Sequence, residues 1–294
     1  MNIVLFIYNP FSGENYILMH LDYIIEEYQK AGYCLIPFRF TIDSRESDLV
    51  ELIQQPYHHI LISGGDGTVN LVVNILMNNS INTPIAVLPA GTANDFAKML
   101  GNNSGIKDAC RKILKGKVSR IDVGKVNSTY FVNVLSAGLF TEVSQRTPTM
   151  LKNTFGKMAY YMNSINELPR FRMMHLNVEA AEGRYNDEAV IFFVFNGRTA
   201  GNLDIAHYSD ERDGLLDVVI IKNNNPIDAV NVFIHFFTNP IIKSSYPSGV
   251  VHFKTKELTI NAISGDIRID IDGEQGPGLP LKISCLHRAL RVIR

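Results

Sequence analysis

The segment with the clearest potential for chemistry is a glycine-rich turn at residues 63–68, which reads Ser-Gly-Gly-Asp-Gly-Thr. It follows a short apolar run, Ile60–Ser63, and precedes apolar residues at helical spacing over Val69–Met77, so it is predicted to join a buried strand to a helix. A turn without Cβ atoms lets a polyanion approach the backbone, and the free amides and dipole of the helix favour negative charge there. Phosphate is the ligand that this chemistry suggests.

Asp66 lies at the centre of this turn and would repel a bare phosphate. A cation between the two resolves the conflict, and Mg²⁺ binds both carboxylate and phosphate oxygens. The alternative is an ordinary strand-to-helix turn with Asp66 as a capping residue, and the residues alone leave it open. The turn is not a Walker loop, because the chain contains no GxxxxGK[ST], and it is not GxGxxG, because Asn70 stands at the last glycine position.

Two more loops rich in small residues follow predicted strands. Asn-Pro-Phe-Ser-Gly at 9–13 comes after the apolar run Ile3–Tyr8, and Pro-Ala-Gly-Thr-Ala-Asn-Asp at 89–95 comes after Ile85–Leu88. Parallel sheets bind ligands outside the carboxyl ends of their strands. The three loops therefore predict a cleft for phosphate and ribose.

The elements that must position these loops alternate along residues 1–122. Predicted strands are Ile3–Tyr8, Tyr33–Phe40, Ile60–Ser63 and Ile85–Leu88, and predicted helices are Glu14–Ala31, Asp48–Gln55, Val69–Met77 and Asn94–Leu100. This alternation predicts a mostly parallel sheet with helices on both faces. Thr92 or Asn94 could cap the last of these helices.

After about Asp122 strand-like runs dominate, and turn residues such as Glu182-Gly183, Asp213-Gly214 and Asp272-Gly273 separate them. This pattern predicts an antiparallel β domain, a sandwich. Two helices are expected to interrupt it, at Phe155–Leu168 and Ile227–Phe237. The predicted strands are Tyr130–Val134, His175–Ala180, Val190–Phe195, Leu216–Ile221, Leu258–Ala262, Ile267–Ile271 and Leu281–Cys285.

The charge balance, the apolar runs and the cysteines exclude several classes of protein. The 294 residues include 28 Lys and Arg against 29 Asp and Glu, which argues against broad electrostatic binding of nucleic acid. The longest apolar run, Ala189–Phe195, is far short of the roughly 18–20 residues of a membrane-spanning helix. The N-terminus lacks the basic leader of a signal peptide, and Cys34, Cys110 and Cys285 form no CxxC motif. We therefore expect a protein of the reducing cytoplasm.

These motifs carry a family resemblance. NPxSG at 9–13, GGDGT at 64–68 and PAGTANDFA at 89–97 resemble the diacylglycerol kinase catalytic-domain family, in particular its soluble bacterial lipid kinases, with sphingosine kinases and NAD kinase as relatives. The segment 210–221, DERDGLLDVVII, is similar to the metal-site segment of that family, and Asp-Gly-Glu at 272–274 is similar to its catalytic DGE. The resemblance covers nearly the whole chain.

The resemblance implies an NAD-kinase-like α/β nucleotide-binding domain at 1–122 and a β-sandwich lipid-binding domain at 123–286. It also implies that residues 287–294 return to the first domain and that ATP lies between the domains. The nucleotide-site candidates that match the family motifs are Asn9, Ser12, Gly13, Thr41, Gly64, Gly65, Asp66, Gly67, Thr68, Asn70, Thr92 and Asp95.

The resemblance further assigns roles to acidic residues. Asp66 would act on Mg²⁺ through water, with Asp95 in the same network, and Asp272 would be the general base, with Glu274 sharing or holding that role. A separate structural Mg²⁺ would be held by Asp210, Asp213 and the Leu215 carbonyl. Without the resemblance, the spacing favours a hairpin turn at 272–273 and a solvated acidic loop at 210–217.

The function implied is an ATP- and Mg²⁺-dependent kinase of lipid metabolism, cytoplasmic and transiently at the membrane surface. It would phosphorylate diacylglycerol to phosphatidic acid, with phosphatidylglycerol or a sphingoid base as alternative substrates. A catalytically weakened lipid- or nucleotide-binding protein stays open, because Leu71 replaces a glutamate of many members and no basic residue follows Gly13. NAD kinase ranks lower, because a DGE in the second domain is not its hallmark. The expected partners are ATP and a membrane lipid. We also expect a peripheral membrane contact, for which Phe233–Ile242 is the candidate segment. Nucleic acid is not an expected partner, and a homodimer is left open.

Overall fold

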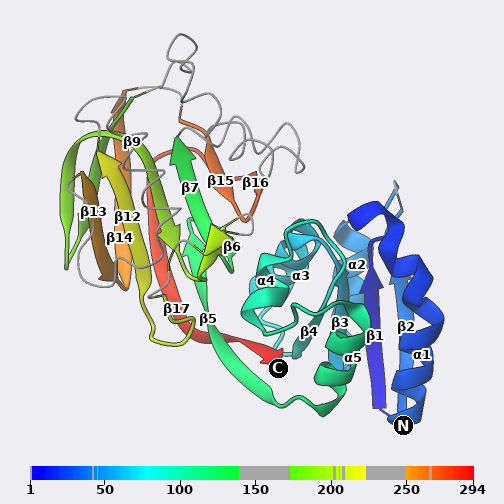
Figure 1. The fold of residues 1–294 in the computed structure, drawn as a ribbon. Coiled ribbons are helices and arrows are strands. Elements are labelled where there is room, and N and C mark those ends of the chain that lie inside the picture. Colours follow the sequence, from blue (N-terminus) through cyan, green and yellow to red (C-terminus); the bar gives the residue numbers. More distant parts are fainter. Residues whose placement is uncertain are drawn as a thin grey trace. The chain divides into compact units, whose positions relative to one another are not determined.

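The computed structural model describes residues 2–41, 43–44, 46–138, 173–200, 203–204, 206, 209–222, 249–264 and 267–294. The chain forms two compact units (Figure 1). The first comprises Met1–Val123 and His287–Arg294, and the second comprises Gly124–Leu286. The predicted helices Phe155–Leu168 and Ile227–Phe237 and the candidate membrane segment Phe233–Ile242 lie outside the described residues.

The first unit is built on a parallel sheet. Its strands lie in the order β2 (Tyr33–Arg39), β1 (Asn2–Tyr8), β3 (His59–Gly64) and β4 (Ile85–Pro89), and each neighbouring pair is parallel. The end of β17 (Leu281–Ile293) pairs in parallel with β4. Successive residues of β3 are all buried, which is the pattern of a strand covered on both faces. The predicted parallel α/β domain is confirmed.

Helices cover this sheet. They are η1 (Gly13–His20, a 3₁₀ helix), α1 (Leu21–Lys30), α2 (Glu46–Ile53), α3 (Asp66–Asn78), α4 (Asp95–Met99) and α5 (Ile106–Lys115). Helix α1 contacts β2 and α5, whereas α3 contacts β3 and α4 (Figure 1). The core includes Val4 and Phe6 of β1 with Ile24 and Tyr28 of α1.

Several predicted boundaries are corrected. The predicted helix Glu14–Ala31 begins as η1 and becomes α-helical only at Leu21. Helix α3 begins at Asp66, three residues before Val69, so the second half of the glycine-rich turn is already its first helical turn. The prediction also omits α5, although its buried residues, Ile106, Ala109, Cys110 and Ile113, recur at the spacing of an amphipathic helix.

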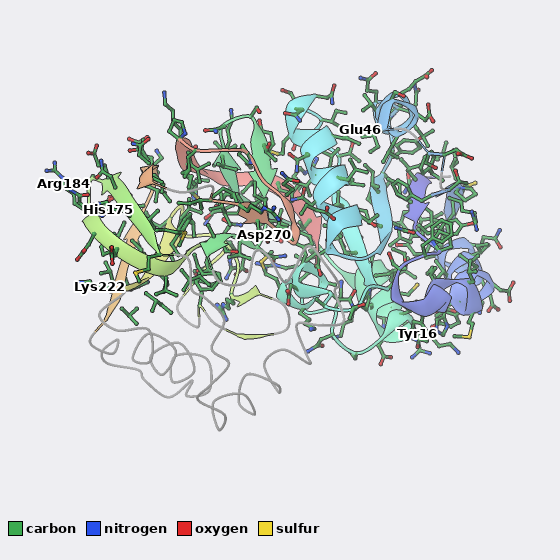
Figure 2. All side chains as sticks on the ribbon, turned by 90° about the horizontal axis from the view of Figure 1, so that it is seen from above. Tyr16, Glu46, His175, Arg184, Lys222 and Asp270 are labelled. Atoms are coloured by element: carbon green, nitrogen blue, oxygen red, sulfur yellow. The ribbon has the colours of Figure 1, made fainter. Side chains whose placement is uncertain are left out.

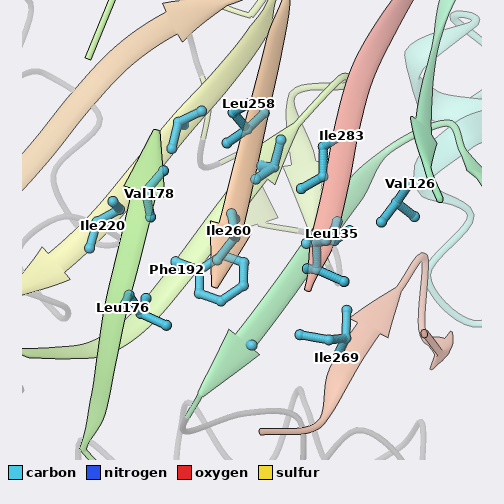
Figure 3. Close-up of a cluster of buried hydrophobic side chains, with 14 of the residues drawn as sticks. Val126, Leu135, Leu176, Val178, Phe192, Ile220, Leu258, Ile260, Ile269 and Ile283 are labelled. Carbon is cyan, nitrogen blue, oxygen red and sulfur yellow. The ribbon is translucent and has the colours of Figure 1, made fainter. Parts of the chain in front are cut away.

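The second unit is a β-sandwich, as predicted. The first half of β9 (Arg184–Phe195) pairs with β8, and its second half pairs with β7 and β12, so β9 joins two parts of one continuous sheet. Leu176, Ile260 and Ile283 from one part and Phe192 and Ile220 from the part that includes β9 and β12 belong to one buried cluster (Figure 3). The other strands are β6 (Thr129–Phe131), β7 (Val134–Gly138), β8 (Met174–Ala180), β10 (Thr199–Ala200), β11 (Leu203–Asp204), β12 (Leu216–Lys222), β13 (Val250–Thr255), β14 (Glu257–Ser264), β15 (Ile269–Ile271) and β16 (Glu274–Gln275).

Two strands have residues in both units. They are β5 (Val118–Val126), which the prediction omits, and β17, which pairs with β5 and with β14 before it reaches β4. The predicted strand Tyr130–Val134 is divided into β6 and β7, with Val132 and Asn133 between them. Among the described residues, no helix has the length and apolar character needed to cross a membrane.

A buried histidine lies at the start of β3. His59 is 2% exposed, and its Nε2 lies 3.2 Å from the Tyr28 hydroxyl. Burial, and then the charge of His58, lower the pKa of His59 to about 3. Such a lowered pKa makes a contribution to the free energy of unfolding that is fully present above the unfolded pKa of about 6.5. This contribution is lost as the pH falls from there toward 3.

The stability of the protein should therefore fall on acidification because the unfolded His59 gains a proton that the folded one does not. At pH 5 the expected cost is about 2 kcal/mol relative to pH 7. Thermal unfolding of the wild type and His59→Gln, followed by circular dichroism from pH 7 to pH 5, measures it. The His59→Gln variant should lose less stability over this range, whereas a His175→Gln control should follow the wild type; equal pH slopes in all three proteins would contradict the expectation.

Candidate active site

The loops that follow β1 and β3 are joined at the topological switch point of the sheet. Strand β1 pairs with β2 on one side and with β3 on the other, so these two carboxyl ends flank the point where the strand order reverses. The Asn9 N–H donates to the Ser63 carbonyl at 2.8 Å, and its side-chain amide lies 3.4 Å from Thr68 Oγ1. The Gly65 N–H donates to Ser12 Oγ at 3.2 Å.

The loop after β4 packs closely on the same two loops. A Cβ at Gly91 would lie 2.5 Å from the Gly65 Cα, and a Cβ at Gly13, which has a φ of +53°, would overlap the Ala90 carbonyl oxygen. Asn94 Oδ1 accepts from the Gly91 N–H at 2.6 Å, and Asn94 Nδ2 donates to the Gly91 carbonyl at 2.8 Å. Asn94 is the N-cap residue of α4, as expected, but its side chain makes no capping hydrogen bond and closes the preceding loop instead.

Packing requires a glycine at position 64 of the turn but not at position 65. A Cβ at Gly64 would clash with the Thr68 side chain, so packing explains that glycine. A Cβ at Gly65 would meet nothing closer than 3.8 Å, and Gly65 has a φ of −80°, which any residue adopts. Packing and backbone conformation therefore leave Gly65 unexplained, although it is the N-cap residue of α3.

The first turn of α3 presents backbone donors at this point. The Thr68 and Val69 N–H groups donate to the Gly65 carbonyl. An α-helix has no internal acceptors for its earliest amides, which here belong to Asp66 and Gly67. Such amides favour an anion.

The Asp66 side chain is hydrogen-bonded to the first turn of α4. Its Oδ1 accepts a hydrogen bond of 3.1 Å from the Phe96 N–H, which directly follows the buried Asp95. Asp66 does not cap its own helix, because Gly65 is the N-cap of α3. Its bond to the second residue of α4 is nevertheless a capping contact, so the alternative of Asp66 as a capping residue stays open. The structure thus brings Asp66 and the first turn of α4 together.

Two predicted nucleotide-site residues, Thr41 and Asn70, make their described contacts elsewhere, whereas a third lies on the loop that packs against the β1 and β3 loops. The Thr41 N–H donates to Ser44 Oγ at 2.8 Å, and its own hydroxyl lies 3.0 Å from the same atom. Asn70 is buried in α3, and its Oδ1 accepts from Asn74 Nδ2. Thr92 is exposed on the β4–α4 loop.

In the second unit, Asp272 and Gly273 form the two-residue turn between β15 and β16. Ile271 pairs with Glu274, and the φ angles of the two turn residues are +51° and +93°, as in a type I′ hairpin. Asp270, labelled in Figure 2, accepts the Gly273 N–H at 3.0 Å. The hairpin expected from Asp-Gly is present.

The Asp272 side chain is buried and held by backbone amides. Its Oδ2 accepts from the Val132 N–H at 2.8 Å, and its Oδ1 accepts from the N–H groups of Asn133 and Val134, both at 2.9 Å. Glu274, by contrast, is exposed. Asp272 is therefore the more firmly oriented of the two predicted catalytic carboxylates.

The acidic segment 210–217 is closed by its own contacts. Asp210 Oδ1 accepts from the Arg212 N–H, and Asp213 Oδ1 accepts from the Leu215 N–H. Asp213 Oδ2 forms an ion pair of 2.8 Å with Lys254 Nζ. Within the described ranges, no group of three His, Cys, Asp or Glu side chains is placed to hold a metal. Asp210 and Asp213 thus have protein partners of their own, and the structural Mg²⁺ at Asp210, Asp213 and the Leu215 carbonyl stays a prediction.

A polar cluster that the sequence analysis missed surrounds Asp217, which is 2% exposed. Its Oδ2 accepts from Ser209 Oγ at 2.6 Å, its Oδ1 lies 2.8 Å from His252 Nε2, and Lys254 Nζ lies 3.4 Å from Oδ2. Burial raises the pKa of Asp217, but the hydrogen bonds from His252 and Ser209 and the charge of Lys254 outweigh it and lower that pKa. Lys254 stands opposite Asp217 in the β12–β13 register, a pairing that the sequence does not reveal.

Comparisons with known proteins give consistent results. Residues 3–126 match the family model of the diacylglycerol kinase catalytic domain, and residues 133–294 match that of the YegS C-terminal NAD kinase beta sandwich-like domain. A diacylglycerol kinase of Bacillus subtilis (strain 168) is 29% identical over 290 residues, which are 98% of this chain and 94% of that protein. A diacylglycerol kinase of Staphylococcus aureus (strain Newman) is 29% identical over 288 residues, 97% of this chain and 90% of that protein.

Solved structures give the same fold. A crystal structure described as a diacylglycerol kinase from Bacillus anthracis str. Sterne has a TM-score of 0.80 and 26% sequence identity. The match covers 99% of this chain and 96% of that one. The likeness therefore extends over both units.

Replacing Lys254 with Met should destabilise the protein, because Asp217 is buried and loses part of its compensating charge. The expected loss is about 1–2 kcal/mol near neutral pH. The Asp217 contribution is present above the ordinary Asp pKa and lost as the pH falls through its lowered value, and the Lys254 contribution is lost as the pH rises through its raised pKa. Thermal unfolding, carried out once with Mg²⁺ and once with a chelator, measures the loss. The same substitution at the exposed Lys256, Lys256→Met, is the control. An unchanged unfolding midpoint for Lys254→Met would contradict the expectation.

Proposed function

The chain belongs to the diacylglycerol kinase catalytic-domain family, and we propose that it transfers the γ-phosphate of ATP to a lipid hydroxyl. Diacylglycerol is the proposed acceptor and phosphatidic acid the product. The first unit binds the nucleotide in this proposal, and the second binds the lipid.

Gly65 is the observation that supports nucleotide binding most directly. Its backbone conformation is open to any residue, and a Cβ there has ordinary van der Waals room. Neither requirement of the protein demands a glycine here. Its N-cap position in α3 favours glycine, and the close approach of a ligand to the backbone gives a second reason. The α3 amides at the same place suit the phosphates of ATP.

Asp66 is the proposed magnesium residue. Its carboxylate supplies the hard oxygen that Mg²⁺ prefers, and the Phe96 N–H orients it beside the amides of α3. Mg²⁺, when bound with ATP, supplies neutralisation of phosphate charge. Ser12, Asn9 and Thr68 hold the β1 and β3 loops in place around it.

Asp272 is the proposed base. Three amides fix its carboxylate, so it can accept a hydrogen bond from the lipid hydroxyl in one orientation and take the proton as the hydroxyl oxygen attacks. The proton leaves late in a loose phosphoryl transfer, so orientation of the hydroxyl matters more than basicity. Glu274 remains the alternative holder of this role.

The setting of the reaction follows from its substrate. A diacylglycerol lies in a membrane, so we propose that the protein is cytoplasmic and contacts the membrane surface transiently as a peripheral protein. A homodimer remains open.

Replacing Gly65 with Ala should weaken ATP binding while leaving the fold intact. The new Cβ finds space in the protein but stands where the phosphates approach, so we expect a loss of affinity of about tenfold or more. The unfolding free energy should fall only by the cost of a poorer N-cap, about 1 kcal/mol. Calorimetric titration with ATP and Mg²⁺, together with thermal unfolding, checks both. Gly278→Ala, where a Cβ also meets open space, is the control. An unchanged affinity for Gly65→Ala would remove the main support for this site.

The proposed reaction is tested by ATP consumption with purified protein and lipids in mixed micelles. Turnover should depend on diacylglycerol and fall by about 10²-fold or more in Asp272→Asn and in Asp66→Ala, because a positioned acid–base group and charge neutralisation are each worth that much. Asp108→Asn, the same substitution at an exposed aspartate of α5, is the control.

The acceptor panel separates the alternatives. Turnover with phosphatidylglycerol or a sphingoid base, and not with diacylglycerol, would change the substrate but keep the lipid kinase. Nucleotide binding without turnover on any lipid would favour a binding protein, and turnover with NAD would select NAD kinase.

A further inference from the structure

The carboxylate of Asp272 is positioned by a short piece of backbone. Residues 132–134 donate three consecutive N–H groups to it, which makes a small anion-binding concavity from the main chain. Because the three donors come from one segment, the position of the carboxylate depends on the position of that segment.

Val132 and Asn133 lie between β6 and β7 and belong to neither strand. Their carbonyls are instead bound by the residues that follow β9. Asn196 Nδ2 donates to the Val132 carbonyl at 2.9 Å, and the Asn196 N–H donates to the Asn133 carbonyl at 2.8 Å. The Gly197 N–H reaches the same Asn133 carbonyl at 3.0 Å. Asn196 therefore holds both peptide units of the segment.

Burial makes this arrangement sensitive to a single side chain. Val132, Asn133 and Asn196 are 1%, 3% and 1% exposed. Water cannot readily replace a donor at such a position, and a buried carbonyl without a donor is unfavourable. The segment would then shift to recover a partner, and the three amides would move with it.

We propose that Asn196 is a positioning residue for the reaction, which acts on Asp272 through the backbone of residues 132–134. The inference rests on the proposed function only in taking Asp272 as the base. Asn196 touches neither substrate nor reacting atoms in this account. Its side-chain amide supplies one of the three hydrogen bonds that hold the carbonyls of the segment, and the N–H groups of that segment hold the carboxylate.

A double-mutant cycle on turnover tests this linkage. Asn196→Ala should lower kcat about 10–100-fold and leave the KM for ATP nearly unchanged, because the nucleotide loops belong to the first unit. In an Asp272→Asn background the same change should have little further effect. Equal losses in both backgrounds would mean a general structural role and would overturn the proposal. Asn186→Ala, an exposed asparagine on β9, is the matched control, and Asn196→Ser replaces the alanine variant if the latter does not fold.

Hydrogen exchange tests the same linkage without any turnover. The amides of residues 132–134 should be protected in the wild type and should exchange at least tenfold faster in Asn196→Ala, whereas amides of β8 and β14 keep their rates. Unchanged exchange at 132–134 would overturn the positioning role even if the protein is a lipid kinase. Faster exchange in a protein that phosphorylates no lipid would sustain the linkage to Asp272 and refute only the proposed function.

Discussion

Parallel pairing of β1, β3 and β4 is the constraint on which the candidate nucleotide site depends. The register places Tyr8 opposite Ser63 and Gly64 opposite Pro89, so the three strands end together. Their loops then have to pass one another at short range. Gly13 and Gly91 are required by that crowding, since each would place a Cβ against the backbone of a neighbouring loop. The small residues at this edge are thus in part a consequence of strand register, whereas neither packing nor backbone conformation demands a glycine at position 65.

Much of the fold could be predicted because the sequence repeats its patterns locally. The buried strands β1, β3 and β4 are short apolar runs bounded by turn residues, and the Asp-Gly hairpin at 272–273 has a strong local preference. The start of α3 was placed too late because Asp66 and Gly67 are poor helix formers in isolation. Their helical conformation depends on the Gly65 N-cap and on the bond from Phe96 to Asp66, which joins residues 30 apart.

The contacts of the candidate site residues could not be predicted either, because their partners are also distant in the sequence. Motif spacing identifies Asp66 and Asp272 as acidic residues near turns, but it does not reveal what holds each carboxylate. The partners of Asp272 are amides 138–140 residues away, and Lys254 meets Asp217 only through the β12–β13 register. A backbone N–H has no side-chain identity, so no residue type in the sequence could have revealed the segment 132–134. His252 and Lys254 could have been found only by assuming the correct strand pairing.

Asp66 and Asp272 are held by the same kind of interaction, and this has a chemical consequence. An N–H group carries a partial charge, so it orients a carboxylate without forming an ion pair with it. Asp217 shows the contrasting arrangement, in which Lys254 supplies a full positive charge at 3.4 Å. A carboxylate that acts on a metal or on a substrate proton needs a fixed position, and amide donors provide it. Like a nearby cation, these donors also favour the charged form of the carboxylate. The described contacts of Asp217 therefore give it a structural role, whereas those of Asp66 and Asp272 orient two carboxylates that are proposed to take part in the chemistry.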